Sequence, residues 1–165
     1  MNATENTDVS LRPLFDRKRR WSREEYRKIL TALPAGYCPF CDWSETQDVL
    51  REFDQWVWIV NKSAYWRYHT LIIPKRHFSS FFDSNPSEVA EYHRVGRYVT
   101  RMYQNSHLEQ ALLSHSRERH TTGGRLAHFH QHFAPESEGM LAPTLVPDAN
   151  HWDSSVFLAE TGLEH

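Results

Sequence analysis

The sequence predicts a single domain that mixes β-strands with α-helices, and three observations support this. The chain has 165 residues, a length that suits one hydrophobic core. Short segments rich in β-branched and aromatic residues recur along it. A longer segment, ending near Gln104, carries apolar side chains at the three-to-four spacing of a helix.

The N-terminal residues 1–20 are polar and charged without periodicity, so we expect a flexible or loosely docked arm. Its basic run, residues 17–20, is expected to be solvated, because a net charge of −2 argues against a dedicated polyanion binder. Contact of this arm with nucleic acid stays open.

The rest of the chain, residues 21–162, is expected to form the domain. Residues 163–165 resemble the start of a histidine tag and carry no functional weight. The longest apolar runs are too short to span a bilayer, and the N-terminus lacks the apolar centre of a signal peptide. We therefore expect a cytoplasmic protein.

The first half of the domain predicts a short helix and a strand pair. Residues 22–25 have the form of a capping box, which predicts a helix that ends before Pro34. Residues 49–53 and 56–60 are two strand-like segments separated by two polar residues, and we expect them to pair.

The second half predicts a strand, a long helix and a further strand. The strand after His69 ends at Pro74, which leaves His77 in a loop. Residues 83–88 have the pattern of a helix start, and the helix is expected to run to about Gln104. Residues 111–114 predict another short strand. No clear period follows residue 135, so we expect that tail to wrap over the domain, anchored by its apolar residues Trp152, Val156, Phe157 and Leu158.

The most informative segment is residues 126–133, Leu-Ala-His-Phe-His-Gln-His-Phe. As a strand it would project His128, His130 and His132 to one face, because side chains alternate with period two. A row of imidazoles is a poor choice for plain packing but suits the chemistry of a small ligand. Just before it, Gly124 allows a ligand to approach the backbone closely.

The only two cysteines are separated by two residues, in Cys38-Pro-Phe-Cys41. This spacing lets one turn present two thiolates to a tetrahedral metal. It also fits a redox dithiol, although the flanking sequence does not offer the βαβ context of a thioredoxin.

Three segments together resemble the histidine-triad (HIT) family over about residues 36–135: Cys38–Cys41, His69–His77 and His128–Phe133. The resemblance implies an α+β fold, with an antiparallel sheet of about five strands, a long helix packed on it and a short N-terminal helix. It also implies an enzyme, often a homodimer, that acts on nucleoside phosphates through a nucleotidyl-histidine intermediate.

The resemblance further implies roles for the histidines. His130 matches the nucleophile, a role that suits an imidazole whose second nitrogen is held by a backbone carbonyl. His132 is expected to contact the phosphate or donate a proton to the leaving group, and His69 to line the same pocket. In zinc-containing bacterial members the metal is held by residues that match Cys38, Cys41, His77 and His128, a structural site with no open position.

Three positions depart from the family pattern. Tyr68 stands where many members have glycine, which is expected to narrow the pocket mouth. Arg125 stands near the place of a phosphate-binding serine, where it is either a charged phosphate ligand or a plain surface residue. Gln131 occupies a position that is usually apolar.

The preferred function is that of a zinc-containing nucleotide hydrolase that cleaves a nucleoside phosphoramidate or a dinucleoside polyphosphate. One alternative is a nucleotidyltransferase or phosphorylase of the same superfamily, which commonly has glutamine where this chain has His132. Another is a zinc-stabilised nucleotide-binding module without turnover. Release of mononucleotide from such substrates distinguishes the enzymes from the module.

Overall fold

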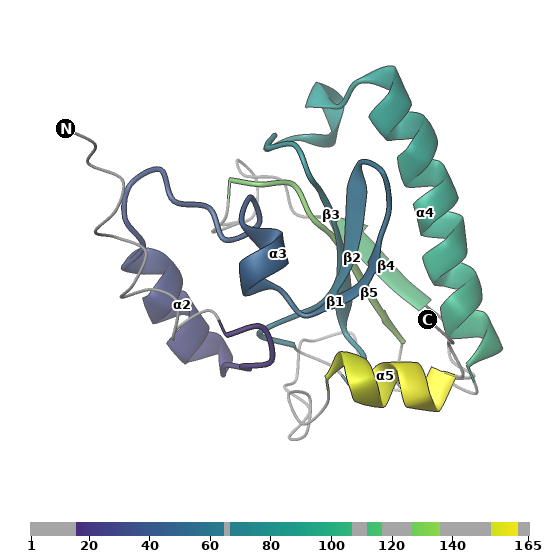
Figure 1. Ribbon diagram of the computed structural model, residues 1–165, viewed down its shortest axis with the longest axis horizontal. Coiled ribbons are helices and arrows are strands. Elements are labelled where there is room, and N and C mark those ends of the chain that lie inside the picture. The colour runs from purple at the N-terminus through teal and green to yellow at the C-terminus, as the bar shows by residue number, and fades with distance from the viewer. Residues whose placement is uncertain (1–15, 65–66, 107–111, 117–126, 136–152, 162–165) are drawn as a thin grey trace.

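The computed structural model describes residues 16–64, 67–106, 112–116, 127–135 and 153–161. Its centre is a five-stranded antiparallel sheet with the order β1-β2-β3-β5-β4 (Figure 1). The strands are β1 Val49–Glu52, β2 Trp56–Val60, β3 Thr70–Pro74, β4 Leu112–Ser116 and β5 Gln131–Pro135. The helices are α2 Arg23–Thr31, α3 Trp43–Thr46, α4 Pro86–Asn105 and α5 Ser154–Thr161, with a 3-10 turn at Phe81–Asp83. This is the α+β class that the sequence predicted.

Helices cover both faces of the sheet. The long helix α4 lies along one face, and α2 and α3 lie on the other side (Figure 1). Trp56, Trp58 and Val60 of β2 join the core beneath α4, whereas Val57 and Ile59 join a smaller core on the opposite face. Because both faces are covered, β2 is apolar throughout.

Helix α4 begins where its sequence predicted. Asn85 caps the helix and forms a capping box with Glu88, and Pro86 occupies the first turn. The buried Glu88 carboxylate also accepts two hydrogen bonds from Arg76, at 2.7 Å each. This pairing lowers the pKa of Glu88 and holds the loop that carries His77 against the helix.

The histidine-bearing strand begins later than we expected. We predicted a strand over residues 126–133, but β5 begins at Gln131. The pairing of Ile72 with Gln131 would, if continued, set Phe129 opposite Pro74. Proline has no N–H to donate, so the ladder stops, and the Phe129 N–H donates instead to the carbonyl of Phe78 at 2.7 Å.

The C-terminal helix α5 was not predicted, because its apolar residues Val156, Phe157 and Leu158 are consecutive and do not follow a helical period. Phe157 is fully buried, with its ring against those of Trp58, Tyr68 and Tyr103. The expectation that this residue anchors the tail is confirmed. Trp152 lies outside the described residues.

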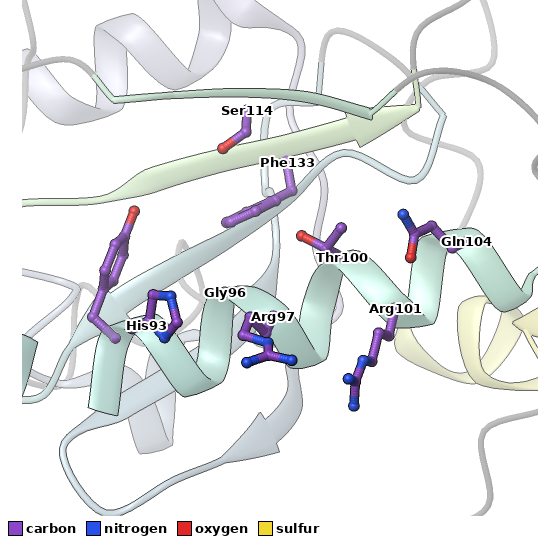
Figure 2. Close-up of a pocket in the computed structure, with 9 residues that line it drawn as sticks. His93, Gly96, Arg97, Thr100, Arg101, Gln104, Ser114 and Phe133 are labelled. Atoms are coloured by element: carbon purple, nitrogen blue, oxygen red, sulfur yellow. The ribbon is translucent and has the colours of Figure 1, made fainter. Parts of the chain in front are cut away.

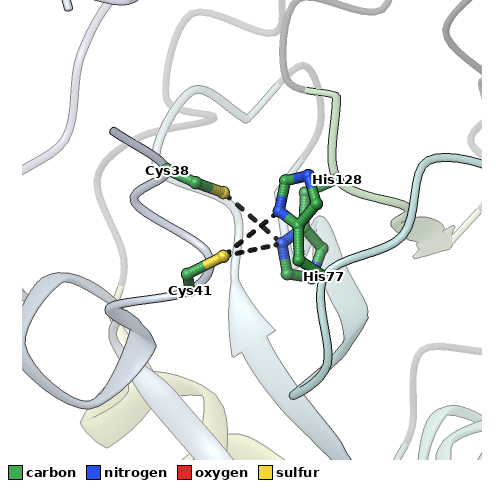
Figure 3. A group of neighbouring side chains, drawn as sticks. All are labelled: Cys38, Cys41, His77 and His128. Carbon is green, nitrogen blue, oxygen red and sulfur yellow. Dashed lines mark hydrogen bonds between the residues drawn. The ribbon is translucent and has the colours of Figure 1, made fainter. Parts of the chain in front are cut away.

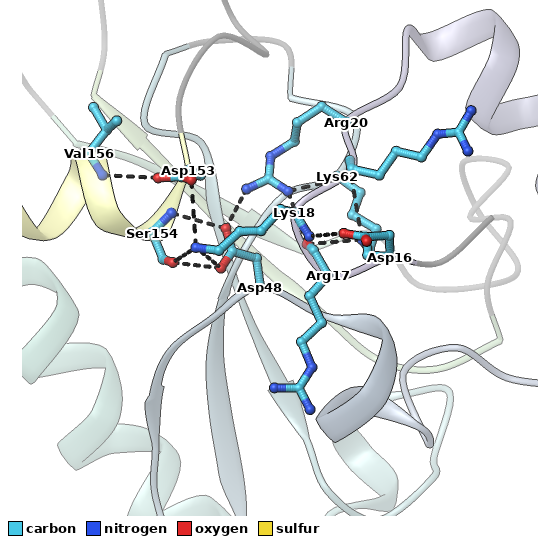
Figure 4. A network of polar contacts seen from close by, with 10 residues as sticks. Asp16, Arg17, Lys18, Arg20, Asp48, Lys62, Asp153, Ser154 and Val156 are labelled. Atoms are coloured by element: carbon cyan, nitrogen blue, oxygen red, sulfur yellow. Dashed lines mark hydrogen bonds and ion pairs between the residues drawn. The ribbon is translucent and has the colours of Figure 1, made fainter. Parts of the chain in front are cut away.

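The buried carboxylate of Asp48 joins both terminal segments to the start of β1 (Figure 4). It pairs with Arg20 at 2.5 Å and with Lys18 at 3.0 Å, and it accepts hydrogen bonds from the backbone N–H and hydroxyl of Ser154 at 3.0 and 2.6 Å. Burial alone would raise the pKa of Asp48, but these hydrogen bonds outweigh it and lower the pKa.

Lys62 holds the same N-terminal segment from another side. Its buried ammonium donates to the carbonyl oxygens of Asp16, Arg17 and Arg19 at 2.6, 3.2 and 3.4 Å. Burial lowers its pKa to about 7. Residues 16–20 are therefore docked on the domain, and residues 1–15 of the expected arm lie outside the described residues. Among the described helices, none has the length and apolar character needed to cross a bilayer.

We expect Asp48→Asn to lower the free energy of unfolding by about 3 kcal/mol at neutral pH, because it removes one partner of a buried ion pair. A carboxylate whose pKa is lower in the folded state stabilises the fold above its unfolded pKa of about 3.9, and this contribution disappears as pH falls through the folded pKa. The loss of unfolding free energy caused by Asp48→Asn should therefore be smaller at acid pH than at neutral pH. Urea denaturation at the two pH values would measure it. Glu24→Gln, at the exposed Glu24–Lys28 pair, should change stability by less than about 0.5 kcal/mol. An equal penalty for Asp48→Asn at both pH values would contradict this role of the charge.

Candidate active site and metal centre

Four side chains from three separate segments form a cluster (Figure 3). Cys38 and Cys41 lie on one turn, His77 follows β3 and His128 precedes β5. Their ligand atoms all lie within 4.8 Å of one another. The Nδ1 atom of His128 is 3.4 Å from Cys38 Sγ and 3.5 Å from Cys41 Sγ, and His77 Nδ1 is 3.2 Å from Cys41 Sγ.

The cluster fits a tetrahedral zinc ion. Bond lengths of about 2.3 Å to sulfur and about 2.0 Å to nitrogen place the S and N ligands of a tetrahedral site roughly 3.5 Å apart, close to the distances found here. The Nε2–H of His128 is directed at the carbonyl oxygen of Pro74 at 2.8 Å, which leaves Nδ1 as the metal-binding nitrogen. Two thiolates and two imidazoles would complete the coordination of zinc, with no position open for substrate.

The protonation of this cluster depends on burial. Burial lowers the pKa of His128 to about 4, so its imidazole stays neutral at physiological pH, as a ligand must be. Burial, together with the neighbouring Cys38, raises the pKa of Cys41 to about 12. A bound cation would reverse this, because it stabilises the thiolate form.

His69 and His132 form a buried pair beside the cluster. The Nε2 atom of His69 is 2.8 Å from Nδ1 of His132, and both residues are almost inaccessible to solvent. His132 lies opposite Leu71 in the register of β5 and β3, on the face away from α4. The sheet therefore fixes the direction of His132, and His69 directly precedes β3.

His130 lies between the pair and the cluster. Its ring is 5.0 Å from that of His132, and Phe40 contacts the rings of both His130 and His128, with centroids 5.4 and 5.7 Å away. The Nδ1 atom of His130 is 2.8 Å from the carbonyl oxygen of His128. This contact favours the tautomer with its proton on Nδ1 and its lone pair on Nε2, the form that a histidine nucleophile requires.

The alternation predicted for the histidines is present although only His132 lies in a strand. Phe129 and Phe133 join the core under α4, and Gln131 is buried and donates to Ser114 Oγ at 2.7 Å. That bond accounts for a polar residue on the packed face. Gly124 and Arg125, expected to bind substrate, lie outside the described residues.

Two features differ from the sequence analysis. The Tyr68 ring is buried against Phe157, so it does not narrow a pocket mouth. Asn61 was missed: its amide nitrogen lies 3.3 Å from both ring nitrogens of His69, and its Oδ1 accepts from the Ser63 N–H at 2.9 Å. A polar residue directly after the wholly apolar β2 was the available signal.

The fold and the site define an α+β protein with a cluster of histidines beside a candidate metal centre. The family model of the HIT domain matches residues 44–139, more than half of the chain. The chain therefore belongs to the HIT family, whose members are generally nucleotide hydrolases or transferases.

Solved structures agree with this assignment. A Zn-bound histidine triad family protein from Mycobacterium smegmatis matches with 25% identity and a TM-score of 0.58, over 76% of this chain and 93% of that chain. A hypothetical histidine triad nucleotide-binding protein from Sulfolobus tokodaii matches with 20% identity and a TM-score of 0.61, over 76% of this chain and 92% of that chain. Plasmodium falciparum diadenosine triphosphate hydrolase shares the fold, with 11% identity, a TM-score of 0.58 and coverage of 70% and 74%. No curated protein matches the sequence.

Proposed function

We propose that this protein is a nucleotide hydrolase that cleaves a nucleoside phosphoramidate or a dinucleoside polyphosphate through a nucleotidyl-histidine intermediate. The observation that carries the proposal is the 2.8 Å contact between His130 Nδ1 and the His128 carbonyl, next to the His69–His132 pair. Membership of the HIT family and the likeness to a diadenosine triphosphate hydrolase support it.

The first step uses His130 as nucleophile. Its Nε2 lone pair attacks the α-phosphorus, an N–P bond forms, and the bond from phosphorus to the leaving amine or phosphate breaks. The His128 carbonyl stabilises the positive charge that the His130 ring acquires, because it accepts the Nδ1 proton in a hydrogen bond. Water then attacks phosphorus, the N–P bond breaks and a nucleoside monophosphate is released.

His132 is proposed to donate the proton that the leaving group needs, or to hold a phosphate oxygen. His69 is buried next to His132, and its Nε2 atom lies 2.8 Å from Nδ1 of His132. We therefore assign His69 to orienting His132 within the site. The amide nitrogen of Asn61 lies 3.3 Å from both ring nitrogens of His69 and is proposed to help hold this ring.

The four-residue cluster is proposed to bind a structural zinc ion. Zinc would join the Cys38–Cys41 turn to the segments that precede β5 and follow β3, and so fix the residue that carries the His128 carbonyl. The likeness to a Zn-bound histidine triad protein supports this assignment.

A homodimer is proposed to form at α4 and the edge strand β4. A hollow of about 420 Å³ lies between them, lined by residues of α4, β4 and β5 that include Gly96, Arg97, Thr100, Ser114 and Phe133 (Figure 2). Strand β4 is the last in the sheet order, so its outer backbone groups can pair with a second copy. This hollow lies on the face of the sheet away from His132.

We expect His130→Asn to reduce turnover by at least roughly a thousandfold, because it removes the nucleophile. The measurement is mononucleotide release from adenosine phosphoramidate and from diadenosine polyphosphates, with trapping of an acid-labile nucleotidyl adduct on the wild-type protein. Product identification with and without added phosphate separates hydrolysis from phosphorolysis. Arg94→Gln, at an exposed residue of α4 outside those that line the hollow, is the control and should be fully active. Full activity of His130→Asn would end the assignment.

Zinc analysis tests the cluster. Protein purified without chelators should contain one zinc per chain, and Cys41→Ser should lose it. The free energy of unfolding should fall by about 4 kcal/mol, the stabilisation expected from a ligand at a thousand times its Kd. Arg94→Gln should keep its zinc. Wild-type protein without bound zinc, and without a rise in Tm on zinc addition, would contradict the site.

Gly96→Trp tests the dimer. A Cβ at Gly96 would meet no atom within 4 Å, so a side chain can start from this position into the hollow. We expect the wild-type protein to sediment at twice its chain mass of 19.6 kDa and the variant to sediment as a monomer. Arg94→Trp, at an exposed position of α4 outside the residues that line the hollow, should remain dimeric. A monomeric wild-type protein, or a dimeric Gly96→Trp, would show that this face is not the interface.

A further inference from the structure

The residue before His69 has an unusual backbone conformation. Tyr68 has a φ of +62°, and it is the only residue other than glycine with a positive φ among those that the structure describes. Side chains with a Cβ adopt this region at a cost, so the surrounding structure must hold it. Such residues gather at functional sites, and this one sets the direction in which the chain enters His69.

The hydroxyl of Tyr103 holds Tyr68 in place. It donates to the Tyr68 carbonyl oxygen at 2.5 Å, and it belongs to a buried residue near the end of α4. The Tyr68 ring packs at the same time against Phe157 of α5, with ring centroids 5.7 Å apart. Both the backbone and the side chain of this strained residue are therefore fixed from the α4 side of the sheet.

The same hydroxyl is one link in a chain of hydrogen bonds. The indole N–H of Trp58 donates to Thr70 Oγ1 at 2.8 Å, and Thr70 Oγ1 is 2.7 Å from Tyr103 Oη. Because each hydroxyl has one proton, the consistent direction runs from Trp58 to Thr70, then to Tyr103, then to the Tyr68 carbonyl. Burial raises the pKa of Tyr103, so its hydroxyl keeps the proton that it donates. Successive bonds of this kind strengthen one another.

This series of hydrogen bonds flanks His69 on both sides and reaches the residue after His132. Tyr68 and Thr70 are the residues on either side of His69. The Tyr103 hydroxyl also lies 3.4 Å from the carbonyl oxygen of Phe133, the residue that follows His132. Alternation along β5 and β3 directs His132 to the face opposite α4, so the hydroxyl acts on the pair from behind the sheet.

We propose that Tyr103 is a positioning residue for the reaction: its hydroxyl fixes the backbone around His69 and His132 and so sets the 2.8 Å contact between their rings. This inference rests on the function proposed above. It assigns a role in the reaction to a residue on the face of the sheet opposite the histidine pair. In the sequence, Tyr103 is an ordinary member of an amphipathic helix. Tyr103 does not touch substrate.

Tyr103→Phe removes the hydroxyl alone, and Tyr98→Phe is its matched control. Tyr98 lies on the same helix, and its hydroxyl accepts a hydrogen bond from Arg51 at 2.7 Å near the surface. We expect Tyr103→Phe to lower kcat about tenfold with KM within about twofold, because misplaced groups slow the chemistry more than they weaken binding. Tyr98→Phe should keep both constants, and both variants should keep the zinc content of the wild type.

A second readout does not need turnover. The imidazole ¹⁵N resonances of His69 and His132 should shift in Tyr103→Phe and stay unchanged in Tyr98→Phe, because only the first loses a bond next to them. Folded Tyr103→Phe with wild-type kcat and unshifted resonances would overturn the inference. If the wild-type protein turns over none of the substrates, the proposed function fails, and the resonances still decide whether Tyr103 positions the pair.

Thr70 provides the second pair of variants if Tyr103→Phe does not fold. Thr70→Val removes the hydroxyl that is hydrogen-bonded to Tyr103, with little change of side-chain shape. Thr70→Ser keeps a hydroxyl at the same position. We expect Thr70→Val to lower kcat about tenfold and Thr70→Ser to keep it within about twofold of the wild type. Equal kcat in the two Thr70 variants would overturn the inference.

Discussion

The site depends on the way in which His128 is held. Its Nε2–H is directed at the Pro74 carbonyl, its Nδ1 faces the two cysteines, and its own carbonyl accepts from His130. One residue thus links the candidate metal centre to the candidate nucleophile. Pro74 makes this possible, because a residue that cannot donate ends the β3–β5 ladder and leaves its carbonyl for the imidazole. A metal held by this cluster would therefore act on the reaction only through geometry.

The two faces of the sheet carry different kinds of residues. Residues of β2 and β5 that face α4, together with Phe129 just before β5, form an aromatic core that includes Trp58 and Phe133. The opposite face carries His132, beside the smaller apolar core that contains Leu71. In the described part of this core, a series of hydrogen bonds runs from Trp58 through Thr70 and Tyr103 to the Tyr68 carbonyl. A satisfied network of this kind specifies one arrangement of the backbone, which a purely apolar core does less well.

The terminal segments are part of the same structure although they lie outside the matched HIT domain. Asp48 pairs with Arg20, and its carboxylate accepts a hydrogen bond from the backbone N–H of Ser154, the first residue of α5. Phe157 of the same helix is buried in the main core. The packing of Phe157 on Tyr68 connects the C-terminal helix to the residue before His69. The geometry of the histidine pair therefore depends on residues that the family motif does not include.

The sequence by itself determined the α+β class, the helix start within residues 83–88, the alternation of the histidines and the four members of the candidate metal cluster. These follow from local rules, namely side-chain period, capping and ligand spacing, or from a family motif that is read residue by residue. The tertiary structure alone decided where β5 begins, because that depends on a proline in another strand. It also decided the partners of Asn61, Asp48 and Tyr103, whose bonds join positions far apart in the chain. Only the tertiary structure showed helix α5 as well. Its consecutive apolar residues have no helical period in the sequence, and the helix is visible only from the packing of Phe157 against Trp58, Tyr68 and Tyr103.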